Sequence, residues 1–175
     1  MKLSRSSSLA AMLVVALAFA LAPARSFAQA PSLPEALISL AEAHVIMDGA
    51  VAAAVEKNAR IGIVVMDASG EMLAAEHMDG APGRNIMFAQ GKAFGSIMYR
   101  TPSRALSEVY KTRPDRYFGI MNTYGNKIYM VEGGFPLVVD GKLVGAVGVA
   151  GSNMDELYAQ AGIAAWEKQR GQLRK

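Results

Sequence analysis

Residues 133–152, GGFPLVVDGKLVGAVGVAGS, form the most informative stretch of this sequence. Two apolar runs, Phe135–Val139 and Leu143–Val149, flank Asp140-Gly141, a dipeptide that tolerates positive φ and suits a tight two-residue turn. Glycine weakens a strand interior unless a bend or a close backbone approach requires it, and the second run contains Gly145 and Gly148. The pattern predicts two central strands in a β-hairpin. We expect the first or the last helix, or another subunit, to lie on their small residues.

Helical and strand patterns surround this hairpin. Ser32 to Glu35 has the spacing of a capping box and predicts a helix to about Lys57. Ile61–Met66 is apolar on both faces, as in a central strand, and Glu71–Met78 is predicted to return beside it. The other expected elements are a helix from Asn85 to about Tyr99, a short helix or turn at 103–109, a loop at 111–116, a strand at 127–132 and a helix from Asn153 to about Lys168. Residues 117–125 fit neither pattern. Hairpins with separate helices predict an α+β fold, an antiparallel sheet with helices packed on it.

The first 28 residues have the pattern of an export signal. Lys2 and Arg5 form a basic start, and Leu9–Ala22 is an unbroken apolar run, too short for an ordinary membrane span. Ser26-Phe27-Ala28 offers small residues to a signal peptidase, so we expect cleavage after Ala28, with Ala30 as the alternative and an uncleaved anchor as the competing interpretation. The signal predicts a periplasmic or secreted protein with no stable membrane insertion after cleavage.

Composition excludes several classes of function. The net charge of +3 belongs to the precursor, because Lys2, Arg5 and Arg25 leave with the signal and no acidic residue does. The remaining charges balance, so we expect no nucleic-acid partner. The chain has no cysteine, which excludes thiol catalysis, zinc–thiolate sites and iron–sulfur clusters. Residues 29–175 have a length that suits a single domain.

Histidine is scarce in this chain, with only two residues. No serine stands in a G-x-S-x-G pattern and the glycines of the hairpin lie within a strand, so neither a hydrolase triad nor a dinucleotide loop is indicated. His44 falls on the apolar stripe predicted to face inward, four residues before Asp48. It is either a core histidine oriented by Asp48, or an axial ligand to haem iron with Asp48 on its other ring nitrogen. His77 is expected to be exposed, and no catalytic residue is predicted.

Positive and aromatic side chains gather around the second predicted helix. The positive residues predict a solvated helix face or partners for carboxylates and propionates. The aromatic residues predict core and interface packing, or walls for a flat ligand. The positive residues are Arg84, Lys92, Arg100 and Arg104, and the aromatic ones are Tyr99, Tyr110, Tyr117, Phe118 and Tyr124.

Several motifs, with their spacing over residues 33–167, carry a family resemblance. They are VVMDASG (64–70), HMDGA (77–81), Lys92-Ala93, Thr101-Pro102, GGFP (133–136) and DGKLVGAVGVAG (140–151). Together they resemble the GlcG/HbpS family of haem-binding proteins (DUF336-like), to which the PduO C-terminal domain is related. His77 departs from this pattern, which has arginine before Met-Asp-Gly, and it is an extra candidate ligand.

The resemblance implies a profilin-like or PAS-like antiparallel sheet of about five strands and homo-oligomers, from dimers to octamers. It implies haem as the cofactor, with a cobalamin-type tetrapyrrole as the less favoured alternative. Within the family both a histidine of the first helix and a threonine have been implicated as iron ligands, so His44 is the candidate axial ligand here and Thr101 the second. The cofactor-binding candidates in this sequence are His44, Asp48, Lys92, Thr101, Gly133 and Gly134.

The leading expectation is an exported haem- or tetrapyrrole-binding protein rather than a classical enzyme. The resemblance implies a role in haem sequestration, haem degradation, or redox sensing with a two-component sensor partner. One alternative is an enzyme acting on a small carboxylated metabolite, with Lys92, Arg84 and Glu132 as its polar site. Another is a sensory oligomer without catalysis, in which the glycine-rich hairpin is an interface.

Overall fold

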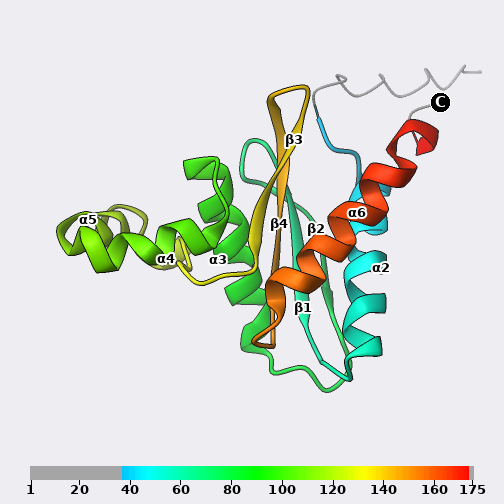
Figure 1. Cartoon of the computed structure of the whole chain (residues 1–175), viewed down its shortest axis with the longest axis horizontal. Helices are drawn as coiled ribbons and strands as arrows, with labels where there is room; N and C mark the ends of the chain where they lie inside the picture. Colours follow the sequence, from blue (N-terminus) through cyan, green and yellow to red (C-terminus); the bar gives the residue numbers. More distant parts are fainter. Residues whose placement is uncertain (1–36, 174–175) are drawn as a thin grey trace, which may run out of the picture. The chain divides into compact units, whose positions relative to one another are not determined.

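The computed structural model describes residues 37–173, in which one antiparallel sheet carries helices on both faces (Figure 1). These residues belong to one compact unit, Leu33–Lys175. The expected signal and the capping box at Ser32 to Glu35 lie outside the described residues. Within the described residues no helix is both long and apolar enough to cross a membrane. The predicted α+β class is confirmed.

The sheet has the strand order β2-β1-β4-β3, with β1 at Gly62–Asp67, β2 at Met72–His77, β3 at Gly134–Val139 and β4 at Lys142–Ala150. All neighbouring strands are antiparallel. The turn between β3 and β4 is Asp140-Gly141, with φ of 49° and 75°, as the hairpin prediction requires. β1 pairs along its whole length with β4, which is central, whereas β3 is an edge strand. The prediction of two central strands is therefore correct for β4 and wrong for β3.

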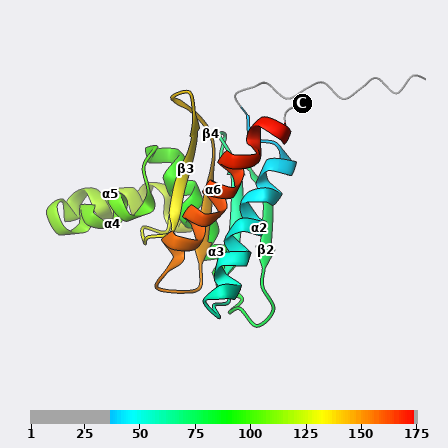
Figure 2. The same cartoon turned by 45° about the vertical axis from the view of Figure 1, so that its right-hand side comes forward.

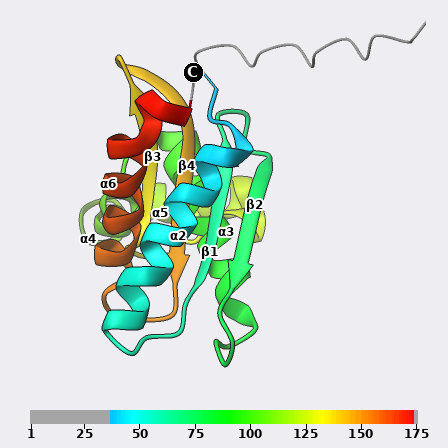
Figure 3. The same ribbon diagram turned by 90° about the vertical axis from the view of Figure 1, so that its right-hand side faces the viewer.

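The three long helices cover both faces of the sheet, two on one face and one on the other. Helices α2 (Leu40–Glu56) and α6 (Asp155–Leu173) lie side by side on one face (Figure 3). Helix α3 (Arg84–Tyr99) covers the other face. Helices α4 (Ser103–Thr112) and α5 (Pro114–Tyr124) extend beyond α3, away from the sheet (Figure 2). The short helix η1 (Gly125–Lys127) follows α5 and leads back towards β3.

The bare backbone of β4 is covered by α3 rather than by the first or last helix. A Cβ atom at Gly148 would overlap the carbonyl oxygen of Ala89 and would lie 2.9 Å from the amide nitrogen of Ala93. Only glycine allows the helix to approach the strand this closely. The predicted close approach to a helix is confirmed, but the helix that makes it is α3, not α2 or α6.

The first described helix begins at Leu40, later than predicted. Ser39 is its N-cap, and the capping box joins the Ser39 side chain to the amide nitrogen of Glu42 at 3.2 Å and the Glu42 carboxylate to the Ser39 amide at 2.8 Å. Glu42 is fully buried, and its carboxylate also accepts hydrogen bonds from the Trp166 indole at 3.1 Å and from Arg170 at 3.2 Å, which offset the cost of burial. These partners lie on α6, so they orient α2 with its Glu42 side inward.

The region between α3 and β3 differs most from expectation. Residues 111–125 are largely helical, because Pro114 at the first helical position lets α5 begin one residue after Arg113. Residues 128–132 form no strand, so the described sheet has four strands instead of about five. Ile128 and Met130 are buried beside α4 and α5, and Tyr129 stacks on Phe88 of α3 at 4.3 Å. Residues 128–130 therefore pack against α3, α4 and α5 instead of pairing with a strand of the sheet.

We expect Gly148→Ala to lower the free energy of unfolding by about 3 kcal/mol, because the added methyl group meets backbone atoms of α3 that cannot move aside separately. Gly171→Ala is the matched control, since a Cβ atom there meets nothing within 4 Å, and its effect should stay within about 1 kcal/mol. Urea unfolding followed by circular dichroism measures both. Equal stability of the two variants would contradict the packing described here.

Candidate functional site

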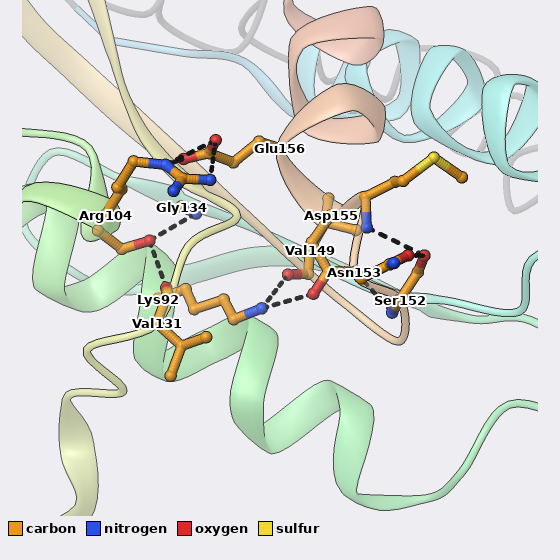
Figure 4. Close-up of polar contacts among 11 residues, drawn as sticks. Lys92, Arg104, Val131, Gly134, Val149, Ser152, Asn153, Asp155 and Glu156 are labelled. Carbon is orange, nitrogen blue, oxygen red and sulfur yellow. Dashed lines mark hydrogen bonds and ion pairs between the residues drawn. The ribbon is translucent and has the colours of Figure 1, made fainter. Parts of the chain in front are cut away.

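Lys92 lies at the centre of a buried polar cluster (Figure 4). It comes from the middle of α3 and is 2% exposed. Its Nζ atom donates to the carbonyl oxygen of Val149 at 2.8 Å and to the Oδ2 atom of Asp155 at 2.7 Å. Val149 belongs to β4 and Asp155 is the first residue of α6, so one ammonium group joins three elements.

Gly133 and Gly134 lie directly against Lys92. A Cβ atom at Gly133 would stand 3.1 Å from the Lys92 Nζ atom and 2.7 Å from the Asp155 Cβ atom. A Cβ atom at Gly134 would stand 2.7 Å from the carbonyl carbon of Lys92. Gly133 also has a φ of 113°, which side chains disfavour. The structure thus brings together Lys92, Gly133 and Gly134, three of the six cofactor-binding candidates.

Ser103, the first residue of α4, connects α4 to the loop before β3 and to Gly134 by two hydrogen bonds. Its hydroxyl donates to the Val131 carbonyl at 2.6 Å and accepts from the Gly134 amide at 2.8 Å. Thr101 is half-buried two residues earlier, at the junction of α3 and α4. Nearby, Arg104 forms an exposed two-pronged ion pair with Glu156 of α6, at 2.8–3.0 Å.

Asp155 has both carboxylate oxygens occupied. Oδ1 accepts from the Ser152 amide at 2.8 Å, while Oδ2 accepts from Lys92. Burial raises the pKa of Asp155, and the hydrogen bond and charge of Lys92 oppose that rise. Because the two charged groups are buried and bonded to each other, their chemical role is to brace α3, β4 and α6.

His44 and Asp48 lie elsewhere, and the expectation that His44 faces inward is wrong. Both are exposed on α2, which covers the face of the sheet opposite to α3. The residues that do face inward are Glu42, Ala43, Ile46, Met47, Ala50 and Ala54. The other side of the helix, which we call the outer stripe, consists of Leu40, Ala41, His44, Asp48, Val51, Ala52 and Val55. Leu40 and Val55 are 52% and 58% exposed.

The remaining candidates are dispersed over the surface. His77 is exposed as predicted, and its Nε2 atom lies 3.2 Å from the Pro82 carbonyl oxygen, beside a shallow groove of about 390 Å³. Arg84 and Arg100 are exposed on α3 and at its end. Glu132 is half-buried in the loop that leads to Gly133. Within residues 37–173 no group of three or more histidine, aspartate or glutamate side chains is arranged to hold a metal ion.

The aromatic residues divide between core and surface. Tyr99, Tyr117 and Tyr124 pack against the small core formed by α4, α5 and residues 128–130. Tyr110 and Phe118 are 55% and 56% exposed and meet Tyr117 edge to face at 5.2–5.5 Å. The interpretation as core packing therefore holds for the first three.

Asp155, Ser103 and Glu42 are the polar residues that sequence reasoning missed. Asp155 stands where an acidic residue at the start of a helix is ordinary. The final helix begins at Asp155, while Asn153, the expected cap, is exposed. Ser39 and Glu42 have the same spacing as Ser32 and Glu35. The sequence therefore contains a second capping box, and this one marks the start of the helix.

Comparison with known proteins assigns the class. The family model described as haem degrading protein HbpS-like matches residues 38–164, and the chain belongs to this family. A curated relative, an uncharacterised 15.0 kDa protein from the dhaT–dhaS intergenic region of Citrobacter freundii, is 28% identical over 130 residues, which are 73% of this chain and 91% of the relative. The resemblance carried by the motifs is confirmed.

Solved structures agree with this assignment. A complex of PduOC with haem has a TM-score of 0.69 and 26% identity, covering 74% of this chain and 94% of that one. A double mutant of Streptomyces reticuli HbpS has a TM-score of 0.66 and 27% identity, covering 82% of this chain and 97% of that one. The chain therefore has the fold of a family associated with haem binding and degradation.

We expect Lys92→Met to lower the free energy of unfolding by about 3–5 kcal/mol, because it leaves the Asp155 carboxylate buried without its partner. Lys92→Met combined with Asp155→Asn should recover part of this loss, since no unpaired charge remains. Lys111→Met, which breaks an exposed pair with Glu108, should cost less than about 1 kcal/mol and serves as the control. An effect of Lys92→Met no larger than that of Lys111→Met would contradict the bracing role.

The deficit of Lys92→Met should shrink as the pH falls. Burial already raises the pKa of Asp155, and the variant removes the charge that opposes the rise. The folded state then binds a proton at a higher pH than the unfolded state does, so the part of the penalty that comes from the unpaired charge is full above the folded pKa and is lost towards pH about 4. Urea unfolding at a series of pH values tests this, and a deficit that grows on acidification would refute it.

Proposed function

We propose that this protein is an exported haem-binding protein whose iron ligand is His44. The observation that carries the proposal is the position of His44, an exposed imidazole on the otherwise largely apolar outer stripe of α2. Membership of the HbpS-like family and the similarity to a haem complex of PduOC support it.

The outer stripe contains the types of side chain that bind haem. Imidazole is a common axial ligand, and Asp48, one helical turn further on, is spaced to orient a ring nitrogen of His44. Leu40 and Val55 offer exposed apolar surface towards the two ends of the helix. When bound, haem would supply a redox-active iron, while this chain supplies the ligand and the apolar contact.

A single chain presents an open helix face at His44, so we propose that a second copy closes over the outer stripe. An exposed apolar stripe on a helix is typical of an interaction surface, and homo-oligomers are the usual assemblies of soluble proteins. Thr101 joins α3 to α4 on the other face of the sheet, so His44 and Thr101 of one chain are not proposed to share an iron.

Haem sequestration, haem degradation and redox sensing with a two-component partner all start from this binding step. A cobalamin-type tetrapyrrole remains the less favoured ligand for the same histidine. The alternative enzyme site built on Lys92, Arg84 and Glu132 has less support, because the Lys92 ammonium is buried and bonded to Asp155. Haem binding at His44 is therefore the function that the geometry supports best.

Titration of the apo protein with hemin should give a saturable shift of the Soret band. His44→Ala should weaken binding by at least tenfold and change the band position, because the axial ligand is lost. His77→Ala, the other histidine, should leave the titration unchanged, and hydroxocobalamin should bind more weakly than hemin.

Absence of a saturable shift in the parent protein would overturn the proposed function. A parent shift that His44→Ala leaves unchanged would overturn the assignment of the ligand. Gel filtration of each variant shows whether its oligomeric state has been preserved.

Export is tested separately. Expressed with its full N-terminus in a Gram-negative host, the protein should appear in the periplasmic fraction, and mass spectrometry should show a chain that begins at Gln29. Ala28→Phe should block cleavage, because the peptidase requires a small residue there. An intact N-terminus on cytoplasmic protein would contradict the proposal.

A further inference from the structure

A groove of about 400 Å³ lies on the α3 side of the sheet, away from the outer stripe of α2. Its apolar lining includes Met66 of β1 together with Met87 and Phe94 of α3. Its polar lining includes Glu71 from the turn before β2, Gln90 from α3 and Lys127 from η1. The volume is at the lower end of the range for small-molecule sites.

The β1–β2 turn forms a fixed wall of this groove. The Oδ1 atom of Asp67 accepts from the Ser69 amide at 2.8 Å, the Ser69 hydroxyl at 2.6 Å and the Glu71 amide at 3.0 Å. Burial acts to raise the pKa of Asp67, but these hydrogen bonds outweigh it and lower the pKa. Gly70 lies against the Phe94 ring, where a Cβ atom would be 3.1 Å from the ring edge. The β1–β2 turn is therefore held in place by contacts within the protein itself.

The three polar side chains at the groove are available to a ligand. Glu71, Gln90 and Lys127 are exposed, and within residues 37–173 their side-chain polar atoms make no hydrogen bond or ion pair to another residue. One is an anion, one a cation and one an amide, which can donate and accept. Opposite charges around a methionine- and phenylalanine-lined surface complement a molecule that carries both charges on an apolar body.

We propose that this groove binds a small zwitterion with an apolar body, of the α-amino-acid type. Its carboxylate lies on Lys127, its ammonium on Glu71 and its side chain on Met87 and Phe94, with Gln90 hydrogen-bonded to either polar end. The site is separate from His44 and does not depend on haem binding.

Isothermal titration with L-phenylalanine and L-methionine tests the proposal. N-acetyl-L-phenylalanine lacks the ammonium group and L-phenylalanine amide lacks the carboxylate, so each should bind at least tenfold more weakly than L-phenylalanine. Lys127→Met and Glu71→Gln should each weaken binding of L-phenylalanine by at least tenfold. Lys168→Met and Glu167→Gln, exposed substitutions on α6, are matched controls and should leave it unchanged.

Three results would overturn the proposal. They are no saturable binding of either amino acid, equal binding of L-phenylalanine and a singly charged analogue, and unchanged binding in Lys127→Met or Glu71→Gln. Hemin titration of Lys127→Met distinguishes this site from the haem site. The Soret shift should persist there, so failure of one site is visible without failure of the other.

Discussion

The Lys92 ammonium is held almost entirely out of water, and the arrangement of both helical layers depends on its partners. Removing an ammonium and a carboxylate from water costs several kcal/mol for each group, which only good geometry with further hydrogen bonds offsets. Here the Val149 carbonyl and the Ser152 amide supply those bonds. The pair fixes the first residue of α6 against α3, and Gly133 and Gly134 leave the space that the contact needs.

The position of α6 in turn orients α2. Trp166 and Arg170, on the later turns of α6, hydrogen-bond the buried carboxylate of Glu42. That contact turns the Glu42 side of α2 towards the core and leaves His44 on the outer stripe. The exposure of the proposed iron ligand is thus the last step of a chain of contacts that starts at the Lys92–Asp155 pair.

This chain of contacts explains which parts of the fold the sequence could predict. The turn between β3 and β4 and the strand β1 are specified locally, by Asp140-Gly141 and by a run of apolar residues, and both were predicted correctly, whereas the edge position of β3 was not. The rotation of α2 was not, because its two sides are similarly apolar and the inward side includes a glutamate. Only the partners of Glu42, more than 120 residues away, settle the choice. Likewise, the β-branched and aromatic residues at 127–132 suit a strand, but Tyr129 stacks on Phe88 and the segment packs against α3 instead.

Three of the candidate residues are in contact with one another, and their contacts indicate a structural role. The family resemblance suggested Lys92, Gly133 and Gly134 as cofactor-binding candidates, and the structure places these three residues in contact. Sequence reasoning read this group as a ligand site because it had no means of finding Asp155, which closes the cluster. A lysine with a free ammonium would remain a functional candidate, whereas one bonded to a buried carboxylate acts through the positions of the elements it joins. Energetic coupling between distant sites requires an element with two arrangements. A brace with both carboxylate oxygens occupied and glycines packed against it holds α3 and α6 in one arrangement, so ligands on the two faces of the sheet should bind independently.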